Sequence, residues 1–346
     1  MESTGREPDL SEEGVLPRTA FLGTGYHVPE RVVTNHELSE LIDTSDAWIV
    51  ERTGIRERRW ASEEDTGAGM ALAASRDALE QAGMDAREID AIVLATLSPD
   101  HFFPGTGVFL QRELGLPGVP ALDIRAQCTG FLYGLSVADA WIRSGQYGTI
   151  LLVGVEIQST GIDVSTRGRD MAVLFGDGAG AVILGATEEE NRGVLSTHLH
   201  ADGSHAEILW CDAASSARHP RISAEDLEAG RHYPTMVGKE VFKHAVTRMP
   251  EVVGEALSAN GLTTEDIALL IPHQANQRIS DLVRRRLGLS EDHVYNNIDR
   301  YGNTTSATIP IALAEAVEQG LLRRGDLLAL TAFGSGLTWG SALIRW

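Results

Sequence analysis

Cys128 carries the clearest chemical signal in this sequence. It follows a short predicted strand at 120–125 and opens a predicted helix that runs to Ser144. Most faces of that helix are apolar, so we expect it to be buried. A cysteine at a helix N-terminus lies at the positive end of the helix dipole, which favours the nucleophilic thiolate. The alternative is an inert cysteine packed in the core, which is a common fate of free cysteines.

Two polar residues far along the chain could act with such a nucleophile. His273 follows the apolar strand predicted at 267–271, and the carboxyl ends of parallel strands are where sites form. Asn303 follows a glycine in the segment DRYGNTTS. Taken alone, the histidine could be bonded inside a loop, and the Gly-Asn pair could be a simple turn. Together, Cys128, His273 and Asn303 suit a nucleophile with polarising partners that the fold brings together.

The glycine-rich end of the chain, AFGSGLTWGSALIRW (332–346), could supply a further part of such a site. Its tight backbone could direct amide N–H groups toward a developing oxyanion, although a turn between two core strands would look the same. FGDGAG (175–180) lacks the spacing of the GxGxxG and Walker motifs, so we interpret it as a structural turn. No spacing typical of a metal site occurs among the eleven histidines and two cysteines.

The elements that must position these residues alternate between strands and helices. Apolar strands are predicted at 19–23, 89–96 and 150–154, and a helix is predicted at 70–83 from apolar residues at helical spacing. Apolar strands that alternate with helices indicate a buried, largely parallel sheet.

The chain also contains an internal repeat. The matching pairs are ALEQAGMDAREIDAIVL (78–94) with ALSANGLTTEDIALLIP (256–272), LGL (114–116) with LGL (287–289), and FGDGAGAVIL (175–184) with FGSGLTWGSALI (333–344). Three matches in the same order indicate two similar α/β halves that meet near 186–192. A buried helix in a duplicated α/β chain argues against the papain-like cysteine proteases, which use the same three residue types.

Composition narrows the class of protein further. The chain has 346 residues, 43% of them hydrophobic, which suits a globular protein with about two domains or one large α/β unit. The formal net charge of −20 opposes binding to nucleic acid or anionic membranes. Two cysteines cannot form a disulfide framework, and no long apolar run predicts a membrane span. The polar N-terminus shows no secretory signal, so we expect a cytoplasmic protein.

Eight segments resemble a known family, the β-ketoacyl-acyl carrier protein synthases III of the thiolase superfamily. They are GTGYHVPERVVTN (23–35), DTSDAWIVERTGIRER (43–58), the Cys128 segment, FGDGAGAVIL (175–184), HLHADG (198–203), PHQANQRI (272–279), DRYGNTTSA (299–307) and FGSGLTWGSALIRW (333–346). The resemblance implies a five-layered αβαβα sandwich of two duplicated halves. We expect an acidic lead-in at 1–17, a first half at 18–188 with Cys128, and a second half at 189–346 with His273 and Asn303.

The resemblance also implies a reaction. Cys128 would accept the acyl group of an acyl-CoA primer, with the backbone N–H groups of Cys128 and Ser335 as the oxyanion hole. His273 and Asn303 would then donate hydrogen bonds to the thioester carbonyl of malonyl-acyl carrier protein. Loss of carbon dioxide would give a carbanion that attacks the acyl-cysteine, so the product would be a β-ketoacyl thioester. No metal or other cofactor is expected, because acyl-CoA is a substrate.

The resemblance also implies which residues bind the substrates, and it implies that the protein forms a homodimer. The residues implied for coenzyme A binding are Trp48, Arg52, Arg167 and Asn276, and those for carrier-protein binding are Lys243 and Arg278. Phe103, in HFFPGTG, is the residue expected to limit the depth of the acyl pocket. Gln127 and Thr129 flank the cysteine at positions where the family frequently has small residues. The resemblance therefore does not identify the acyl primer.

Several alternatives remain at this point. The enzyme could start fatty acids or form a polyketide starter, or it could move an acyl group to a non-malonyl acceptor. A head-to-head condensation would need a carboxylate base near Cys128, for which Glu156 is the nearest glutamate in the sequence. The chain could also belong to a different class of protein, a partner subunit without catalytic activity. The presence of Cys128 argues against this alternative.

Overall fold

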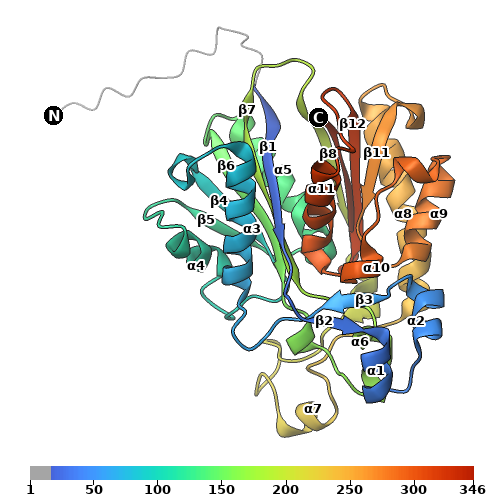
Figure 1. Ribbon diagram of the computed structural model, residues 1–346. Helices are drawn as coiled ribbons and strands as arrows, with labels where there is room; N and C mark the ends of the chain where they lie inside the picture. The colour runs from blue at the N-terminus through green and yellow to red at the C-terminus, as the bar shows by residue number, and fades with distance from the viewer. Residues whose placement is uncertain (1–16) are drawn as a thin grey trace.

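Two mixed β-sheets form the frame of the molecule, and they stand side by side in Figure 1 of this computed structural model, which describes residues 17–346. In spatial order, the strands of the first sheet are β1 (Arg18–His27), β7 (Gly178–Thr187), β6 (Thr149–Glu156), β4 (Ala91–Ala95) and β5 (Ala121–Ile124). Those of the second sheet are β11 (Ile267–Pro272), β12 (Leu327–Gly334), β13 (Thr338–Arg345) and β8 (Gly193–Ala201).

Most strands of each sheet run in one direction, and one strand in each sheet runs the opposite way. Strand β4 is parallel to β5 and β6, but β7 is antiparallel to both β1 and β6. In the second sheet β11 is parallel to β12, while β13 is antiparallel to β12 and β8. The four strands predicted in the first sheet (β1, β4, β5 and β6) thus all run in one direction, as expected, and β7 and β13 are the antiparallel exceptions.

The second sheet repeats the plan of the first. The order β8-β13-β12-β11 corresponds to β1-β7-β6-β4, with the same strand directions. A parallel bridge between Leu270 and Val294 stands where β5 lies in the first half. Because β7 ends at Thr187 and β8 begins at Gly193, we propose that the halves are residues 18–188 and 189–346. The lead-in expected at 1–17 lies, except for Pro17, outside the described residues.

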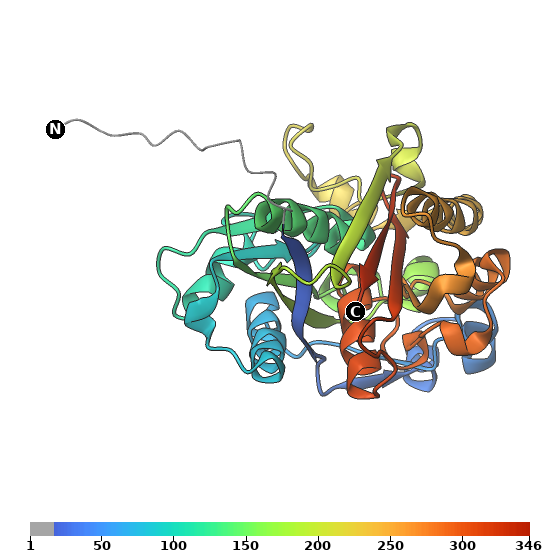
Figure 2. The same cartoon turned by 90° about the horizontal axis from the view of Figure 1, so that it is seen from above.

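Helices cover both sheets and separate them. The outer face of the first sheet carries α3 (Gly67–Ala82) and α4 (Thr106–Glu113), and the outer face of the second carries α8 (Gly238–Ala259) and α9 (Gln277–Leu287). Between the sheets lie α5 (Gly130–Arg143) and α11 (Thr308–Glu318). Figure 2 shows β1 and β8 close together at the centre. The expected five-layered αβαβα sandwich is therefore confirmed.

The middle layer is apolar because both of its helices face two sheets. Phe131 and Leu135 of α5 pack in one cluster with Ile309 and Leu313 of α11 and with strands of both sheets. All four side chains are almost completely buried. Fully burying such a side chain contributes about 1.5–3 kcal/mol, so the apolar faces seen in the sequence fix both helices between the sheets.

Short elements gather at the end of the sandwich that is lowest in Figure 1. They are the paired strands β2 (Val32–Thr34) and β3 (Glu57–Arg59), the paired strands β9 (Leu209–Trp210) and β10 (Thr235–Met236), and the helices α1 (Asn35–Leu41), α2 (Asp46–Thr53), α6 (Arg169–Ala172), α7 (Ala224–Glu228) and α10 (Ile298–Tyr301). Within residues 17–346, no helix has the length and apolar character needed to cross a membrane.

Candidate active site

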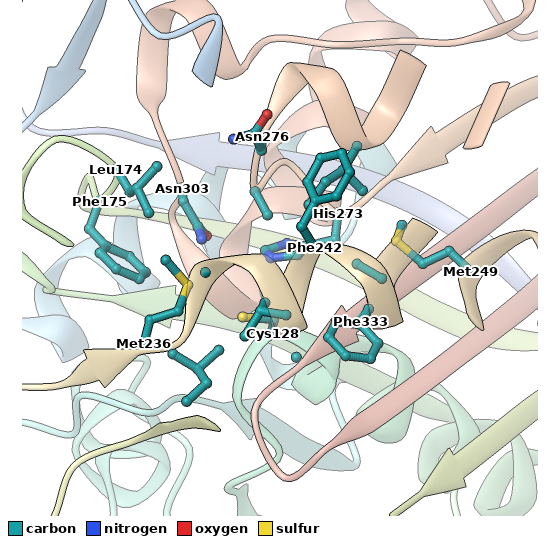
Figure 3. Close-up of a pocket in the computed structure, with 17 residues that line it drawn as sticks. Cys128, Leu174, Phe175, Met236, Phe242, Met249, His273, Asn276, Asn303 and Phe333 are labelled. Atoms are coloured by element: carbon teal, nitrogen blue, oxygen red, sulfur yellow. The ribbon is translucent and has the colours of Figure 1, made fainter. Parts of the chain in front are cut away.

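A buried cavity between the two halves contains Cys128, His273 and Asn303 (Figure 3). Cys128 lies in a 3₁₀ turn, Gln127–Thr129, that follows β5 and precedes α5. His273 follows the last residue of β11, and Asn303 follows α10. Phe333 and Gly334, at the end of β12, close one side of the cavity. The structure thus brings together three residues that the sequence keeps far apart.

The thiol of Cys128 is buried and protonated. Burial and the charge of Glu156 together raise the pKa of Cys128 to about 12, although hydrogen bonds from the backbone N–H groups of Cys128 and Ser335 act to lower it. The helix dipole was expected to favour a thiolate, but α5 begins at Gly130, after the 3₁₀ turn. The expectation of a resting thiolate was therefore wrong, because desolvation outweighs the dipole.

The FGSG turn lies directly against the cysteine. A Cβ atom at Gly334 would come within 2.8 Å of the Cβ of Cys128, so this position needs glycine. The side chain of Ser335 donates to the carbonyl of Leu209, and its backbone N–H faces the sulfur. A serine is accommodated in this turn because its hydroxyl is bonded elsewhere. Two backbone N–H groups therefore converge where an oxyanion on a Cys128-bound carbonyl would form.

His273 is buried and neutral. Burial lowers the pKa of His273 to about 3, well below its usual range. The backbone N–H donates to the carbonyl of Thr331 at 2.8 Å, and Nδ1 lies 2.6 Å from Oγ1 of Thr308. Among the described residues, Nε2 has no hydrogen-bond partner. Sequence reasoning missed Thr308, because a threonine in TTSATIP reads as an ordinary helix start.

Asn303 is held so that its amide nitrogen remains available. Its Oδ1 accepts a hydrogen bond of 2.9 Å from the backbone N–H of Thr305, and its own backbone N–H donates to Leu174 at 2.8 Å. The side-chain oxygen is thus engaged within the loop, and Nδ2 can donate to a substrate. This fixed polarity suits the stabilisation of a negatively charged carbonyl oxygen.

Backbone strain marks both halves of the site. Within the described residues, Gln127 and Thr305 are the two non-glycine residues with positive φ, at 47° and 50°. Each lies within two positions of a candidate catalytic residue, Cys128 or Asn303. Such conformations cost of order 1–3 kcal/mol and persist where the surrounding packing enforces them, often at functional sites.

Glu156 supports the site without lining it. Its carboxylate is fully buried and accepts hydrogen bonds from the hydroxyls of Ser98 and Ser306, each at 2.7 Å, and from the backbone N–H of Leu97. The side chain of Gln158 donates a further bond at 3.1 Å. Because its oxygens are so occupied, Glu156 is poorly placed to act as the base that a head-to-head condensation would need.

A cationic, aromatic mouth leads to the cavity. Trp48, Arg52, Lys239, Phe242 and Arg278 line it, together with Asn276. The guanidinium of Arg52 lies 4.7 Å from the centre of the Trp48 ring. Asn276 caps α9 through a 2.9 Å bond from the N–H of Arg278, and its Nδ2 donates to the carbonyl of Arg52 at 3.0 Å.

Arg169 contacts Trp48, one of the residues that line this mouth. The guanidinium of Arg169 lies 5.0 Å from the centre of the Trp48 ring. Arg167 is paired with Asp163 at 2.6 Å and lies against Gly230. A role of Arg167 in coenzyme A binding stays a prediction, and Arg169, two positions later in STRGRD, is a second candidate.

Two other expected binding residues lie outside the cavity. Phe103 does not line it: the side chain is 80% exposed, on the loop between β4 and α4. Its expected role in limiting pocket depth is thus not met within one chain, because this loop faces outward. Lys243 lies on α8, one turn beyond Lys239, on the same side of the helix.

A duplicated five-layered sandwich with a buried cysteine between its halves defines a thiolase-like protein. A family model described as 3-Oxoacyl-[acyl-carrier-protein (ACP)] synthase III matches residues 122–203, and the model for its C-terminal part matches 257–346. The β-ketoacyl-[acyl-carrier-protein] synthase III of Acidiphilium cryptum is 48% identical over 331 residues, covering 95% of this chain and 100% of the relative. The chain belongs to the β-ketoacyl-acyl carrier protein synthase III family.

Solved structures agree with this assignment. The 3-oxoacyl-[acyl-carrier-protein] synthase III of Aquifex aeolicus has a TM-score of 0.87 and 43% identity, and the match covers 95% of this chain and 100% of that one. A priming β-ketosynthase from the R1128 polyketide pathway has a TM-score of 0.86 and 36% identity, with 96% and 98% coverage. A priming enzyme of a polyketide pathway therefore shares this fold.

Proposed function

We propose that this enzyme joins an acyl-CoA primer to malonyl-acyl carrier protein by decarboxylative Claisen condensation. The observation that supports it most is the convergence of donors on one buried cavity. Two backbone N–H groups face the Cys128 sulfur, and the amide of Asn303 is free to donate. A reaction that creates negative charge on two successive carbonyl oxygens needs donors at both places.

In the first half of the reaction, the primer acylates Cys128. The sulfur attacks the thioester carbonyl, whose oxygen becomes negatively charged beside the N–H groups of Cys128 and Ser335. Coenzyme A leaves, and the acyl group remains on the sulfur. The enzyme must activate a protonated thiol, because burial holds the pKa of Cys128 far above neutrality.

In the second half, malonyl-acyl carrier protein replaces coenzyme A. Asn303 donates to its thioester carbonyl, as does His273 once Nε2 carries a proton, and the departing carboxyl group leaves its electron pair on the enolate. The enolate carbon attacks the acyl-cysteine, and the electron pair of the broken bond returns to the Cys128 sulfur. A dry cavity strengthens each hydrogen bond to the enolate, because water does not compete.

Substrate binding follows from the mouth of the cavity. We propose that Trp48 and Arg52 hold the nucleotide end of coenzyme A, with Asn276 nearer the cavity, and with Arg167 and Arg169 as the two candidates for a further cation. Cations at Lys243 and Arg278 would receive an acidic carrier protein. A local positive patch is needed for this, because the chain as a whole carries a formal charge of −20.

We also propose a homodimer that forms along β5. This strand is an edge of the first sheet, and an unpaired edge is a template for pairing with another chain. Exposed apolar side chains gather in the same region of the chain, namely Leu97, Phe102, Phe103, Val108 and Leu122. Phe103 would then shape an acyl pocket only from across the interface, since it does not reach the cavity of its own chain.

The cell compartment that suits this chemistry is a reducing one. Cys128 and Cys211 are both free thiols in this structure. A catalytic thiol must stay reduced to accept an acyl group, so we propose that the enzyme works in the cytoplasm.

The test is intact-mass spectrometry with a panel of acetyl-, butyryl- and isobutyryl-CoA, followed by malonyl-acyl carrier protein. One acyl group should appear on Cys128 and be discharged as carbon dioxide is released. Cys128→Ala should accept no acyl group, and Asn303→Ala should still be acylated but condense about 10²–10³ times more slowly. Acylation without decarboxylation would favour transfer to a non-malonyl acceptor. If no acyl-CoA labels the wild-type enzyme, the proposal fails and a non-catalytic partner becomes the better reading.

A further inference from the structure

The hydroxyl of Thr308 lies between the imidazole of His273 and a backbone carbonyl. Oγ1 is 2.6 Å from Nδ1 of His273 and donates to the carbonyl of Thr305 at 3.0 Å. Thr308 is 2% exposed, so no solvent can replace either partner. The neighbouring Thr305 has a φ of 50°, and this tight turn brings its carbonyl back toward the first residue of α11.

This arrangement determines where the imidazole proton lies. A threonine hydroxyl has one hydrogen, and here that hydrogen is donated to the carbonyl of Thr305. The same oxygen can then only accept from His273, so Nδ1 must carry the proton. A neutral imidazole has one N–H, which leaves Nε2 with a free lone pair. Nε2 is buried, has no partner among the described residues, and belongs to a side chain that lines the same cavity as Cys128.

We propose that Thr308 is a positioning residue that holds His273 in the Nδ1–H tautomer, so that Nε2 accepts the thiol proton as Cys128 attacks acyl-CoA. This inference rests on the proposed function and deepens it, because it names the group that activates the nucleophile. It also gives a role to a buried hydroxyl that does not itself line the cavity.

The proton balance of the first half closes without another reactant. The S–H bond of Cys128 breaks as an N–H bond forms at Nε2, and the sulfur forms a bond to the acyl carbon. The bond from that carbon to the coenzyme A sulfur breaks, and Nε2 returns the proton to this leaving sulfur. Acyl-cysteine, free coenzyme A and the original Nδ1–H tautomer result.

The second half uses the same nitrogen in the opposite sense. Decarboxylation leaves an electron pair that ends on the Cys128 sulfur, so this half takes up one proton from solvent. Nε2, whose lone pair is free, binds that proton as negative charge develops on the enolate oxygen beside Asn303, because this charge offsets the effect of burial, and it then donates to that oxygen. When the product forms, the proton passes to the sulfur and the tautomer held by Thr308 is restored.

Three variants test this role. Thr308→Val removes the hydroxyl at almost constant shape, Thr308→Ser keeps it, and Thr331→Val is the matched control. Thr331 also has a buried hydroxyl, which donates to the carbonyl of Gly340 at 3.1 Å, and it lies beside His273 without bonding its ring. The thermal midpoint of each variant shows whether it folds.

The main readout is the single-turnover rate of Cys128 acylation, with the acyl-CoA of the panel that labels wild type fastest. Thr308→Val should slow acylation by about 10²-fold, since positioned general bases contribute about 10²–10⁴. Thr308→Ser and Thr331→Val should stay within about threefold of wild type, because neither changes the hydroxyl–imidazole bond. KM for acyl-CoA should change little, because Thr308 does not contact the mouth of the cavity.

The second readout is the ¹⁵N spectrum of labelled histidines in the complete enzyme, with His273 assigned from the spectrum of His273→Asn. Wild type and Thr308→Ser should show a protonated Nδ1 and a bare Nε2, and Thr308→Val should lose this preference. A proton on Nε2 in the wild type would overturn the inference, as would unchanged acylation by Thr308→Val. A wild-type enzyme that no acyl-CoA labels would instead overturn the proposed function.

Discussion

The surroundings of Cys128 determine the pKa of its thiol. Burial removes water from the sulfur, and the carboxylate of Glu156 adds an unfavourable charge, so both raise the pKa of Cys128. The carboxylate of Glu156 accepts hydrogen bonds from the hydroxyls of both Ser98 and Ser306, and it thereby links the two segments that carry them. The same carboxylate therefore organises the catalytic loops and opposes thiolate formation.

This arrangement predicts how the thiol reacts with pH. Because the pKa of Cys128 is about 12, its alkylation by iodoacetamide should keep rising above pH 9, where an ordinary thiol levels off. Glu156→Gln removes the charge and should move the curve to lower pH. Asp177→Asn is the matched control, since Asp177 is buried but its charge does not act on Cys128. Coincident curves for wild type and Glu156→Gln would contradict this electrostatic account.

Sequence reasoning at the residue scale could find the groups that carry chemistry but not those that orient them. Cys128, His273 and Asn303 stand in distinctive surroundings of glycine, proline or apolar residues. Thr308 and Arg169 stand in no such distinctive surroundings. Thr308 contacts His273, more than thirty positions away in the sequence, and Arg169 contacts Trp48, more than a hundred positions away. Only the folded chain brings these partners within reach.

At the scale of elements, the segment that ends in Asn303 is fixed by α11. Glu315 of this helix is buried and bonds both guanidinium nitrogens of Arg300, at 2.7 and 2.9 Å. Tyr301 and Asn297 each donate to the same carboxylate at 2.7 Å. All four residues thus form one network, which holds α10 immediately before the catalytic asparagine.

Loss of this carboxylate should destabilise the enzyme strongly. Glu315→Ala leaves the guanidinium of Arg300 and three other donors, from Tyr295, Asn297 and Tyr301, without their acceptor, and each buried donor left unpaired typically costs about 1–3 kcal/mol. Glu318→Ala, on the exposed side of the same helix, should cost far less. Urea unfolding followed by circular dichroism measures both. Equal losses for the two variants would show that the network contributes little.

The same network predicts an effect of pH on stability. Burial opposes ionisation of Glu315, but hydrogen bonds from Arg300, Asn297 and Tyr301 outweigh it and hold the pKa below its usual range. The ionised carboxylate therefore stabilises the folded state above the unfolded-state pKa, and this contribution is lost as pH falls through the folded-state pKa. The free energy of unfolding of wild type should decline over this range, and Glu315→Gln should decline less steeply.

The elements and the shared direction of the predicted strands could be predicted, whereas the two antiparallel strands could not. The strands expected at 19–23, 89–96, 120–125, 150–154 and 267–271 correspond to β1, β4, β5, β6 and β11, and the helix expected at 70–83 corresponds to α3. Apolar runs reveal burial but not direction, so β7 and β13 could not be recognised as antiparallel from composition. Their direction depends on how the chain turns before them.

At the scale of the whole molecule, the exposed apolar residues near β5 bear on assembly. Leu122 is on the edge strand itself and is 38% exposed. Leu122→Glu should favour the monomer, because it places a charge at the proposed interface. Leu41→Glu is the control, since Leu41 is more exposed, at 55%, but lies on α1. Sedimentation velocity measures both, and a wild-type monomer or a dimeric Leu122→Glu would contradict the proposed interface.

The role of Phe103 in the acyl pocket cannot be derived from one chain alone. The sequence identifies an aromatic pair, Phe102 and Phe103, in a loop that the family resemblance connects with the acyl pocket. In the folded chain both rings are exposed. Whether a residue of one chain shapes a cavity in another depends on symmetry between two chains, which no pattern within one sequence records.

The protonated state of the two free cysteines also has a consequence for survival of the enzyme under oxidative stress. Peroxides attack thiolates, and burial raises the pKa of both Cys128 and Cys211. The sulfur of Cys128 therefore stays protonated and unreactive in the resting enzyme. It becomes nucleophilic only when a thioester occupies the cavity and a base removes the proton. Peroxide should therefore oxidise the resting Cys128 more slowly than it oxidises a catalytic cysteine that is ionised at rest.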